Sequence, residues 1–408
     1  MEVINLLSII QGNVLFRLLS SIALILTILT IAAMTLPSAS LNAHAFRFMV
    51  FCFLFPYIIH FNTSRANSLG HWSFDCWLCL ICWHFIYVTI EICLLPLISP
   101  CAPKWIKPTD EEYERLDKWR KKDKDDSVKE PPIPKEWKTL PYPPLISWSR
   151  ILYAFDIISL SRPGTSHLLR WQLRAFDWSL PAFKKPHISS RFGKPECSAR
   201  VATIHLLVFF ASFAYIYHFV SGLTRPIESI NQLSILNQLL LTISAGSWIA
   251  FSFTMLEVIM FQFVLERRIS PASALTPEFN QPYLAKSIED FWGNRWHHKY
   301  RRHFTRIASL FPYGRTKIGN VLWTFIVSGM MHSYLIARSK PEPSIKNLKS
   351  YLPIFFDSGN ILFFGLQGVG LVIERTLIPT SLRKFWLWAT LILTGRWFIE
   401  SFLKIITV

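Results

Sequence analysis

Two tryptophans, three histidines and four cationic side chains lie within the eighteen residues from Ser287 to Phe304. No apolar run in this segment is long enough to enter a membrane, whereas apolar runs of membrane length lie on both sides of it. Histidine exchanges protons near neutral pH, and lysine and arginine bind phosphate groups. These residue types indicate an interfacial site that combines proton transfer with binding of an anionic substrate.

A helix capped by Asp290 would place Gly293, His297 and Arg301 on one face, because side chains four residues apart stack along a helix. The same segment could instead be an amphipathic helix at the level of the lipid headgroups. Tryptophan is common at that level, and lysine and arginine contact lipid phosphate there. The residues by themselves leave both interpretations open.

A further histidine, His332, lies well inside an apolar run. An ionisable side chain is costly in that setting and is therefore expected to have a partner or a chemical task. Ser328 precedes it by one helical turn and could serve either role. The alternative to a catalytic histidine is one that is hydrogen-bonded within a helix bundle.

Two motifs in this region resemble those of a known family. The stretch Phe291-Trp-Gly-Asn-Arg-Trp-His297 resembles the Phe-Trp-x-x-x-Trp-His signature of the wax synthase-like branch of the membrane-bound O-acyltransferases. The stretch Phe325-Ile-Val-Ser-Gly-Met-Met-His332 resembles their helix that bears the catalytic histidine. Both occur in the family's order and at a familiar spacing, and the chain is most similar to the fungal members that acetylate terpenoid natural products.

The resemblance implies transfer of an acyl group from acyl-CoA to an alcohol. His332 would accept the hydroxyl proton as the oxygen attacks the thioester carbonyl, and His297 would be a second catalytic or oxyanion-positioning group. No acyl-enzyme, metal or cofactor is implied, because acetyl-CoA or another acyl-CoA is a co-substrate. The implied acceptor is a terpenoid or meroterpenoid hydroxyl, and the alternative within the branch is wax ester synthesis from long-chain alcohols.

Acyl-CoA carries three phosphate groups, which a cationic helix end can bind through charge-assisted hydrogen bonds. The candidate donor-binding residues are the four cations of the segment and two neighbours expected to shape the donor tunnel: Arg295, Lys299, Arg301, Arg302, Trp292 and Asn294. Lipid headgroup contact is the alternative for any one of the cations. His298 and His303 have no motif support and are expected at the surface.

The composition indicates a polytopic membrane protein. Of 408 residues, 51% are hydrophobic and 17% charged, with a mean hydropathy of +0.31. The net charge is +17, but the sequence contains no zinc-ligand spacing, RNP motif or basic helix-turn-helix pattern. Nucleic acid is therefore not an expected partner. Cys76, Cys79 and Cys82 share helical spacing but have no second ligand pair nearby, so packing is favoured over a metal site.

The expected fold class is all-α, a polytopic integral membrane bundle of about eight transmembrane helices, with interfacial helices around a catalytic chamber. The expected spans are residues 18–35, 46–61, 77–98, 201–220, 235–265, 318–336, 354–372 and 385–405, and residues 145–160 are an expected interfacial helix. The expected regions are N-terminal membrane helices (1–100), a cytosolic loop with interfacial helices (101–200) and a wax synthase-like catalytic membrane domain (201–408).

Charge predicts the orientation in the membrane. The loop of residues 266–318 holds ten Lys or Arg against four acids, so that side is expected to be cytosolic. The sequon at Asn62 then falls on the lumenal side as a candidate glycosylation site, in a multi-pass protein of the endoplasmic reticulum. Glu91 lies in the third span and should either face protein or water or lie near the helix end.

Two other classes remain open. A polytopic transporter would explain the spans, Glu91 and His332, but not the tryptophan-rich cationic segment, and the chain shows no inverted repeat. A catalytically inactive membrane scaffold would keep the spans without needing His332.

Overall fold

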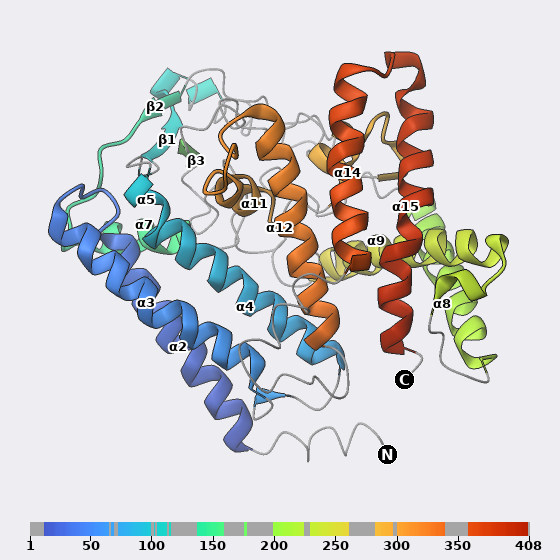
Figure 1. Ribbon diagram of the computed structural model, residues 1–408. Helices are drawn as coiled ribbons and strands as arrows, with labels where there is room; N and C mark the ends of the chain where they lie inside the picture. The colour runs from blue at the N-terminus through green and yellow to red at the C-terminus, as the bar shows by residue number, and fades with distance from the viewer. Residues whose placement is uncertain are drawn as a thin grey trace.

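The computed structural model describes most of the chain as helix (Figure 1). The described residues are 12–64, 67–68, 72–98, 102, 104–111, 114–115, 137–158, 175–177, 199–223, 229–260, 282–296, 300–338 and 358–406. The helices are α2 (Gly12–Met34), α3 (Leu41–Thr63), α4 (Trp72–Cys93), α5 (Leu95–Ile98), α7 (Trp148–Ile158), α8 (Ala199–Ser221), α9 (Ile235–Met260), α10 (Ile288–Asp290), α11 (Arg301–Ala308), α12 (Lys317–Arg338), α14 (Ser358–Thr376) and α15 (Arg383–Ile406). The π-helical turn η7 (Phe291–Arg295) follows α10 directly, and short 3-10 turns cover Ile230–Gln232, Pro282–Leu284 and Thr380–Leu382.

Each of the eight expected spans overlaps a helix, namely α2, α3, α4, α8, α9, α12, α14 and α15, while residues 261–265 and 354–357 of the expected spans lie outside the described part of the chain. Three stretches are long and apolar enough to cross a membrane by length and composition: Val14–Met34, Leu41–Thr63 and Asp75–Ile98. The other five helices have 19 to 26 residues, and about 20 residues suffice to cross a bilayer. The total of eight spans stays a prediction, as does the division of the chain at residues 100 and 200.

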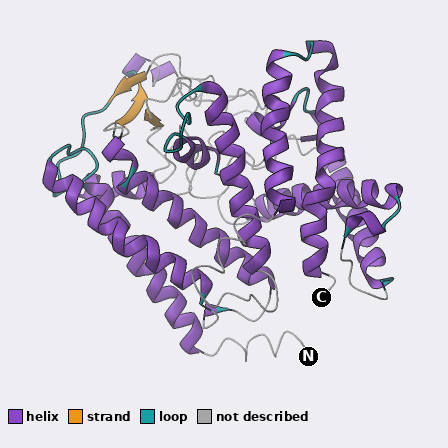
Figure 2. Ribbon diagram, viewed as in Figure 1, coloured by secondary structure: helices purple, strands orange, loops and turns teal. Residues whose placement is uncertain are grey.

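The all-α class is right for the body of the described chain but omits a small sheet (Figure 2). Its strands are β1 (Lys104–Pro108), β2 (Trp137–Thr139) and β3 (Ala175–Asp177), in the antiparallel order β2-β1-β3. Ile106 of the central strand lies opposite both Thr139 and Ala175. Strands of three to five residues are too short to show a period of two, so the sequence predicts a loop in this part of the chain.

Residues 148–158 of the expected interfacial helix are confirmed as helix α7, whereas residues 145–147 form bends before it. In α7 the side chains of Tyr153, Ala154 and Ile157 are buried, whereas Trp148 is exposed. Tyr153 and Ile157 belong to the hydrophobic core that α7 shares with α2, α3 and α4. This one-sided burial is the pattern of an amphipathic helix lying on a bundle. Residues 159 and 160 of the expected helix lie outside the described part of the chain.

One hydrophobic core joins the N-terminal helices to the second half of the chain. It contains residues of α2, α3, α4 and α7 together with Tyr300, Phe304 and Ile307 around α11, and Val327 and Met331 of α12. In Figure 1, α4 runs between α3 and α12, and α14 and α15 stand beside α12. α11 and α12, the helix that carries the second motif, are therefore packed against the N-terminal helices, whereas Phe291 of the first motif packs in a separate core with α14 and α15.

α12 approaches α14 closely at Gly329. A Cβ added there would lie 3.2 Å from Ile361 Cδ1 and 3.3 Å from Phe364 Cβ. A similar contact occurs at Gly368 of α14, where an added Cβ would lie 3.2 Å from the ring of Phe325. Small residues let helices pack closely inside a membrane, and here they bring α14 against the helix that bears His332.

Arg47 fixes the turn between α2 and α3. Its side chain is fully buried, and its Nη1 donates to the carbonyl oxygen of Thr35 at 2.7 Å. Both terminal nitrogens also donate to the carbonyl oxygen of Ser38, at 3.3 and 3.2 Å. The guanidinium thus ties the start of α3 to the end of α2 and the loop between them.

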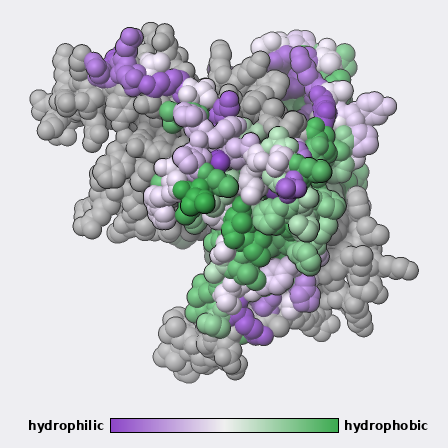
Figure 3. Space-filling view, turned by 90° about the vertical axis from the view of Figure 1, so that its left-hand side faces the viewer, coloured by the Kyte–Doolittle hydropathy of each residue, from purple (hydrophilic) through white to green (hydrophobic). Residues whose placement is uncertain are grey.

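The outer faces of α2 and α3 are apolar. Phe16, Leu19 and Phe53 are between 58% and 78% exposed, an arrangement suited to lipid rather than water. Figure 3 shows hydrophobic residues gathered over the middle of this side of the molecule, with hydrophilic residues mostly above and below them. The distribution matches a bilayer-embedded belt.

Candidate active site

His332 lies two-thirds of the way along α12, with its ring half-buried. Its Nδ1 lies 2.8 Å from the backbone carbonyl oxygen of Ser328, one turn earlier. A carbonyl oxygen only accepts, so Nδ1 carries a proton, and whenever the ring is neutral its lone pair is on Nε2. That tautomer can accept a proton from a substrate. The partner is the Ser328 carbonyl, so the serine hydroxyl is not what orients the ring.

Aromatic rings surround His332 on the side of α14 and α15. The centroid of its ring lies 4.4 Å from that of Phe364 and 6.0 Å from that of Phe398. Phe363 packs in the same group, with its ring centroid 4.8 Å from that of Phe364 in an edge-to-face contact and 5.4 Å from that of Phe398. The result is an apolar wall beside the histidine that excludes water from one side of the ring.

Trp292 of the first motif joins this wall. Its ring centroid lies 5.7 Å from Phe325 and 5.9 Å from Phe364, and Phe364 in turn contacts His332. Its indole nitrogen donates to Gln367 Oε1 at 3.1 Å, and Gln367 donates to Thr394 at 2.7 Å. The fold therefore brings the two sequence motifs together through a shared aromatic cluster.

The first motif is not one continuous helix, which corrects the prediction of a helix capped by Asp290. Ser287 is the N-cap, since its hydroxyl accepts from the backbone nitrogen of Asp290 at 2.9 Å. After α10 the chain forms the π-helical turn η7 and then turns extended at Trp296, before α11 starts at Arg301. π-Helical turns occur often at functional sites. The face expected from i, i+4 spacing does not form, and His297, His298 and Lys299 lie outside the described residues.

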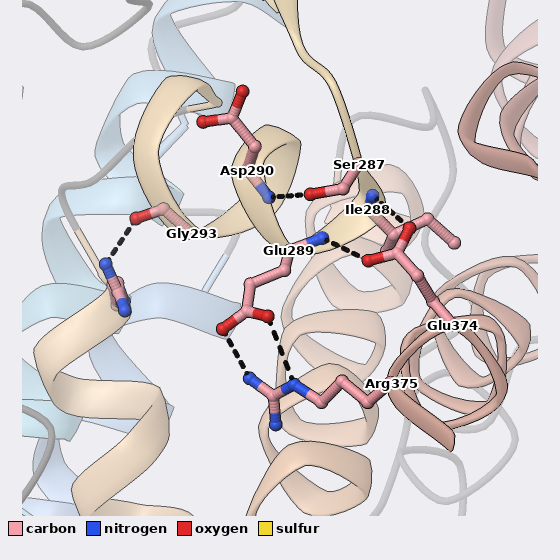
Figure 4. Close-up of polar contacts among 8 residues, drawn as sticks. Ser287, Ile288, Glu289, Asp290, Gly293, Glu374 and Arg375 are labelled. Carbon is pink, nitrogen blue, oxygen red and sulfur yellow. Dashed lines mark hydrogen bonds and ion pairs between the residues drawn. The ribbon is translucent and has the colours of Figure 1, made fainter. Parts of the chain in front are cut away.

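A glutamate from α14 caps the start of this motif segment (Figure 4). Glu374 is fully buried, and its carboxylate accepts from the backbone nitrogens of Ile288 at 2.6 Å and Glu289 at 3.2 Å. A carboxylate at a helix N-terminus is favoured by the free N–H groups and the dipole there. Beside it, Arg375 forms an ion pair with Glu289 at 2.9 Å. Glu374 was not singled out from the sequence, because no local pattern reveals an acid that caps a distant helix.

Two of the four expected donor-binding cations, Arg295 and Arg301, are engaged with the motif segment itself. Arg295 is almost buried and forms an ion pair with Asp290 at 2.8 Å. Arg301 donates to the carbonyl oxygen of Gly293. Burial lowers the pKa of Arg301, and the nearby Glu289 carboxylate opposes that shift. The side chains of Asn294 and Arg302 lie outside the described residues, so acyl-CoA binding by this group of residues stays a prediction.

A buried ionic cluster connects α11 to α4, and it corrects the placement of His303 at the surface. His303 is 2% exposed, and its Nδ1 lies 3.0 Å from Glu91 Oε2. Arg306 Nε lies 2.6 Å from the other oxygen of the same carboxylate. Glu91 thus faces protein, as one of the two interpretations of the sequence required. The signal that was available is the i, i+3 spacing of His303 and Arg306, which puts both on one helix face.

The structure argues against the glycosylation predicted at Asn62. This residue ends α3 with a side chain that is 1% exposed, and its Nδ2 lies 3.8 Å from Cys79 Sγ of α4. A glycan needs a surface asparagine. Cys79 and Cys82 are also buried, in keeping with packing, and within the described part of the chain no cluster of three or more His, Cys, Asp or Glu could hold a metal.

Comparison with known proteins identifies the motif region. Residues 275–356 match the model of the membrane bound O-acyl transferase family. A long-chain-alcohol O-fatty-acyltransferase from Simmondsia chinensis is 27% identical over 217 residues, which are 48% of this chain and 56% of that protein. An acyl-CoA–sterol O-acyltransferase from Arabidopsis thaliana is 32% identical over 99 residues, 21% of this chain and 28% of its own length. The alignments therefore cover about half the length of the first relative and less of the second. No solved structure matches the chain.

Proposed function

We propose, from the match of residues 275–356 to the model of the membrane bound O-acyl transferase family, that this protein is an acyl-CoA-dependent O-acyltransferase acting in a membrane. The observation that carries the proposal is the state of His332. Its Nδ1 is committed to the Ser328 carbonyl, and its ring lies beside the aromatic wall that Trp292 of the first motif completes. A neutral imidazole in that tautomer is a general base.

In the proposed reaction, Nε2 of His332 accepts the proton of the acceptor hydroxyl as its oxygen attacks the thioester carbonyl. The new C–O bond forms and the C–S bond breaks, and the imidazolium returns its proton to the departing CoA sulfur. The products are an ester and free CoA, and no acyl-enzyme forms. Holding both substrates in one water-poor chamber supplies orientation, which accounts for a large part of such a barrier. His297 is the proposed donor to the oxyanion.

The acceptor class we propose is an alcohol that dissolves in the bilayer. The two relatives compared above are named for long-chain alcohols and for sterols, which favours a lipid-like alcohol and a fatty acyl donor. The motif resemblance to fungal acetylating enzymes supports the other candidate, acetyl transfer to a terpenoid hydroxyl. We propose the endoplasmic reticulum membrane as the site of the reaction, on the basis of the many expected spans and the cytosolic acyl-CoA pool.

The test is an acyl transfer assay in microsomes that contain the full-length chain. Acetyl-CoA and palmitoyl-CoA are each supplied with fatty alcohols, sterols and hydroxylated terpenoids. His332→Ala should lower turnover about 10²- to 10⁴-fold, the usual contribution of a positioned general base. His218→Ala is the matched control, because that histidine is exposed on α8.

Transfer from palmitoyl-CoA to fatty alcohols or sterols would select the wax-type function, and acetylation of terpenoids would select the other. Turnover that is unchanged in a well-expressed His332→Ala protein would refute the mechanism. Absence of transfer with every donor and acceptor, together with movement of a solute across the membrane, would favour a transporter.

A further inference from the structure

Arg150 of α7 is a buried cation that has no anion beside it in the described part of the chain. The residue is 8% exposed, and its Nε and Nη1 are sealed from solvent without a hydrogen-bond partner. Nη2 has no partner among the described residues either, and it is the nitrogen that still reaches the surface. The guanidinium carbon lies over the ring of Tyr153, 5.8 Å from its centroid. A buried charge is costly unless it is paired, so this guanidinium calls for an anion at Nη2.

A second cation lies beside the same aromatic pair. The ring centroids of Tyr142 and Tyr153 are 6.1 Å apart, and Nζ of Lys104 in β1 lies 5.6 Å from the centroid of Tyr142. Lys104 is exposed and, like Arg150, forms no ion pair with the described residues. Each tyrosine of the pair therefore carries one cation, and two positive charges without a described carboxylate between them favour a negatively charged ligand.

The tyrosine pair lies just beyond the end of a candidate membrane span. The hydroxyl of Tyr142 donates to the carbonyl oxygen of Ala102 at 2.9 Å. The span that contains α4 ends at Ile98, only four residues earlier. α7 also packs against α2, whose outer face is apolar. The phosphates of lipid headgroups lie at the ends of such spans, and anionic lipids are enriched in the cytosolic leaflet, the side expected for residues 101–200.

The segment before α7 exposes apolar side chains close to the cations. Leu145, Ile146 and Trp148 are 55%, 96% and 70% exposed. The hydroxyl of Ser147 accepts from the backbone nitrogen of Arg150 at 3.2 Å, which ties this apolar tip to the start of the helix. Tryptophan and aliphatic side chains are favoured at the boundary between headgroups and acyl chains. Insertion of the tip there brings lipid phosphates to the level of Arg150.

We propose that Arg150 and Lys104 bind the phosphate of an anionic phospholipid. Nη2 of Arg150 donates to a phosphate oxygen in a charge-assisted hydrogen bond, which supplies the missing counter-charge. The apolar tip of residues 145–148 lies among the acyl chains of the same leaflet. A phosphate without acyl chains would leave that tip without an apolar partner. No residue of this site belongs to the aromatic wall beside His332, so occupancy does not depend on acyl transfer.

The experiment uses the purified full-length protein in detergent, freed of bound lipid, with dioleoyl phosphatidylglycerol or dioleoyl phosphatidylcholine as the probe. The two lipids share the phosphate and the acyl chains, but choline carries a compensating cation. Phosphatidylglycerol should raise the melting temperature at an about tenfold lower concentration, the factor of one charge-assisted hydrogen bond. Arg150→Gln should lose that preference, whereas Arg315→Gln, which removes an exposed arginine, should keep it.

Arg150→Met distinguishes a ligand site from a purely structural arginine. Without lipid this variant should melt no lower than the parent, because it removes a buried charge that has no partner. With phosphatidylglycerol only the parent should gain stability. A variant that is destabilised without lipid, and that still prefers phosphatidylglycerol, would overturn the proposal whatever the assay of acyl transfer gives.

Two further comparisons identify the source of the phosphate. Inorganic phosphate and CoA should not displace a fluorescent phosphatidylglycerol, because neither has acyl chains to place around the tip. Ile146→Ser should weaken phosphatidylglycerol binding about tenfold, the loss expected for one isoleucine kept from an apolar setting. Ile235→Ser, at an exposed isoleucine of α9, should not weaken it. Displacement by CoA at the concentration that phosphatidylglycerol requires would assign the site to the acyl donor and overturn the lipid site.

Discussion

Glu374 and Ile288 are 86 residues apart in the chain, yet a carboxylate oxygen of the first lies 2.6 Å from the backbone nitrogen of the second. The other carboxylate oxygen accepts from Glu289. α14 thereby fixes the start of the segment that carries Trp292, while Phe363 and Phe364 of the same helix contact that tryptophan. A single helix positions both the first motif and the wall beside His332.

Glu374→Leu should lower both thermal stability and turnover. The substitution removes the acceptor from two backbone amides, and each buried donor left unsatisfied costs about 1 to 3 kcal/mol. Glu374→Gln keeps one acceptor oxygen and should lose less. The measurements are the melting temperature in detergent and kcat, with Glu289→Gln as control because that acid is half-exposed. A Glu374→Leu protein as stable and active as the parent would show that the cap is dispensable.

Arg295 and Asp290 should behave as one unit in a double-mutant cycle. Their side chains are 10% and 22% exposed, and the ion pair is formed within the motif segment. Arg295→Gln and Asp290→Asn should therefore cause similar losses, and the double variant should lose little more than either. Direct binding of a CoA phosphate by Arg295 predicts something else: a KM for acyl-CoA that rises only in Arg295→Gln. Comparison of acyl-CoA with its dephospho form separates the two outcomes.

Glu91→Leu should be strongly destabilising. It removes the carboxylate from His303 and from the mostly buried guanidinium of Arg306, and removal of one partner of a buried ion pair costs about 3 to 5 kcal/mol. Glu91→Leu combined with Arg306→Met should recover part of the loss, because no unpaired guanidinium remains. The readout is the melting temperature. As a control, Lys138→Met breaks the exposed pair with Asp110 and should change the melting temperature little. Similar shifts in Lys138→Met and Glu91→Leu would mean that the buried cluster contributes no more stability than an exposed ion pair.

Trp292→Phe should reduce turnover more than it reduces donor affinity. The phenyl ring keeps part of the contact with Phe364, but Gln367 Oε1 loses its indole donor in a buried setting. The expected result is a lower kcat with a nearly unchanged KM for acyl-CoA. Trp323→Phe is the matched control, since the indole of this α12 residue donates to the Pro312 carbonyl in an exposed hydrogen bond. Equal effects of the two substitutions would argue against a positioning role for Trp292.

The long helices could be predicted because apolar runs of membrane length are a strong signal. His332 could be singled out for a related reason, since an ionisable residue inside such a run is unusual. Hydropathy along the sequence gave no such indication where the burial of a side chain depends on a partner far away in the chain. His303 lies in a strongly polar segment, and only the contact with Glu91 shows that it is buried.

The same limit explains the other corrections. A π-helical turn at Phe291–Arg295 and an extended residue at Trp296 leave no periodic pattern, so i, i+4 spacing wrongly predicted one helix. The sequon at Asn62 depends only on three neighbouring residues, whereas the burial of the Asn62 side chain depends on packing against Cys79 of the next helix. Pairing across helices is a property of the packed molecule and is not visible in a window of residues.

The buried guanidinium of Arg47 also has a consequence for biosynthesis. An arginine inside a membrane helix costs about 2.5 to 3.5 kcal/mol at the helix centre when nothing receives its hydrogen bonds. Here the acceptors are carbonyl oxygens of Thr35 and Ser38, which the ribosome makes before α3. The acceptors are thus made before the charge they bind, and we expect α2 and α3 to enter the bilayer as a hairpin. A chain that starts at α3 would leave Arg47 without its acceptors and fail to insert that helix stably.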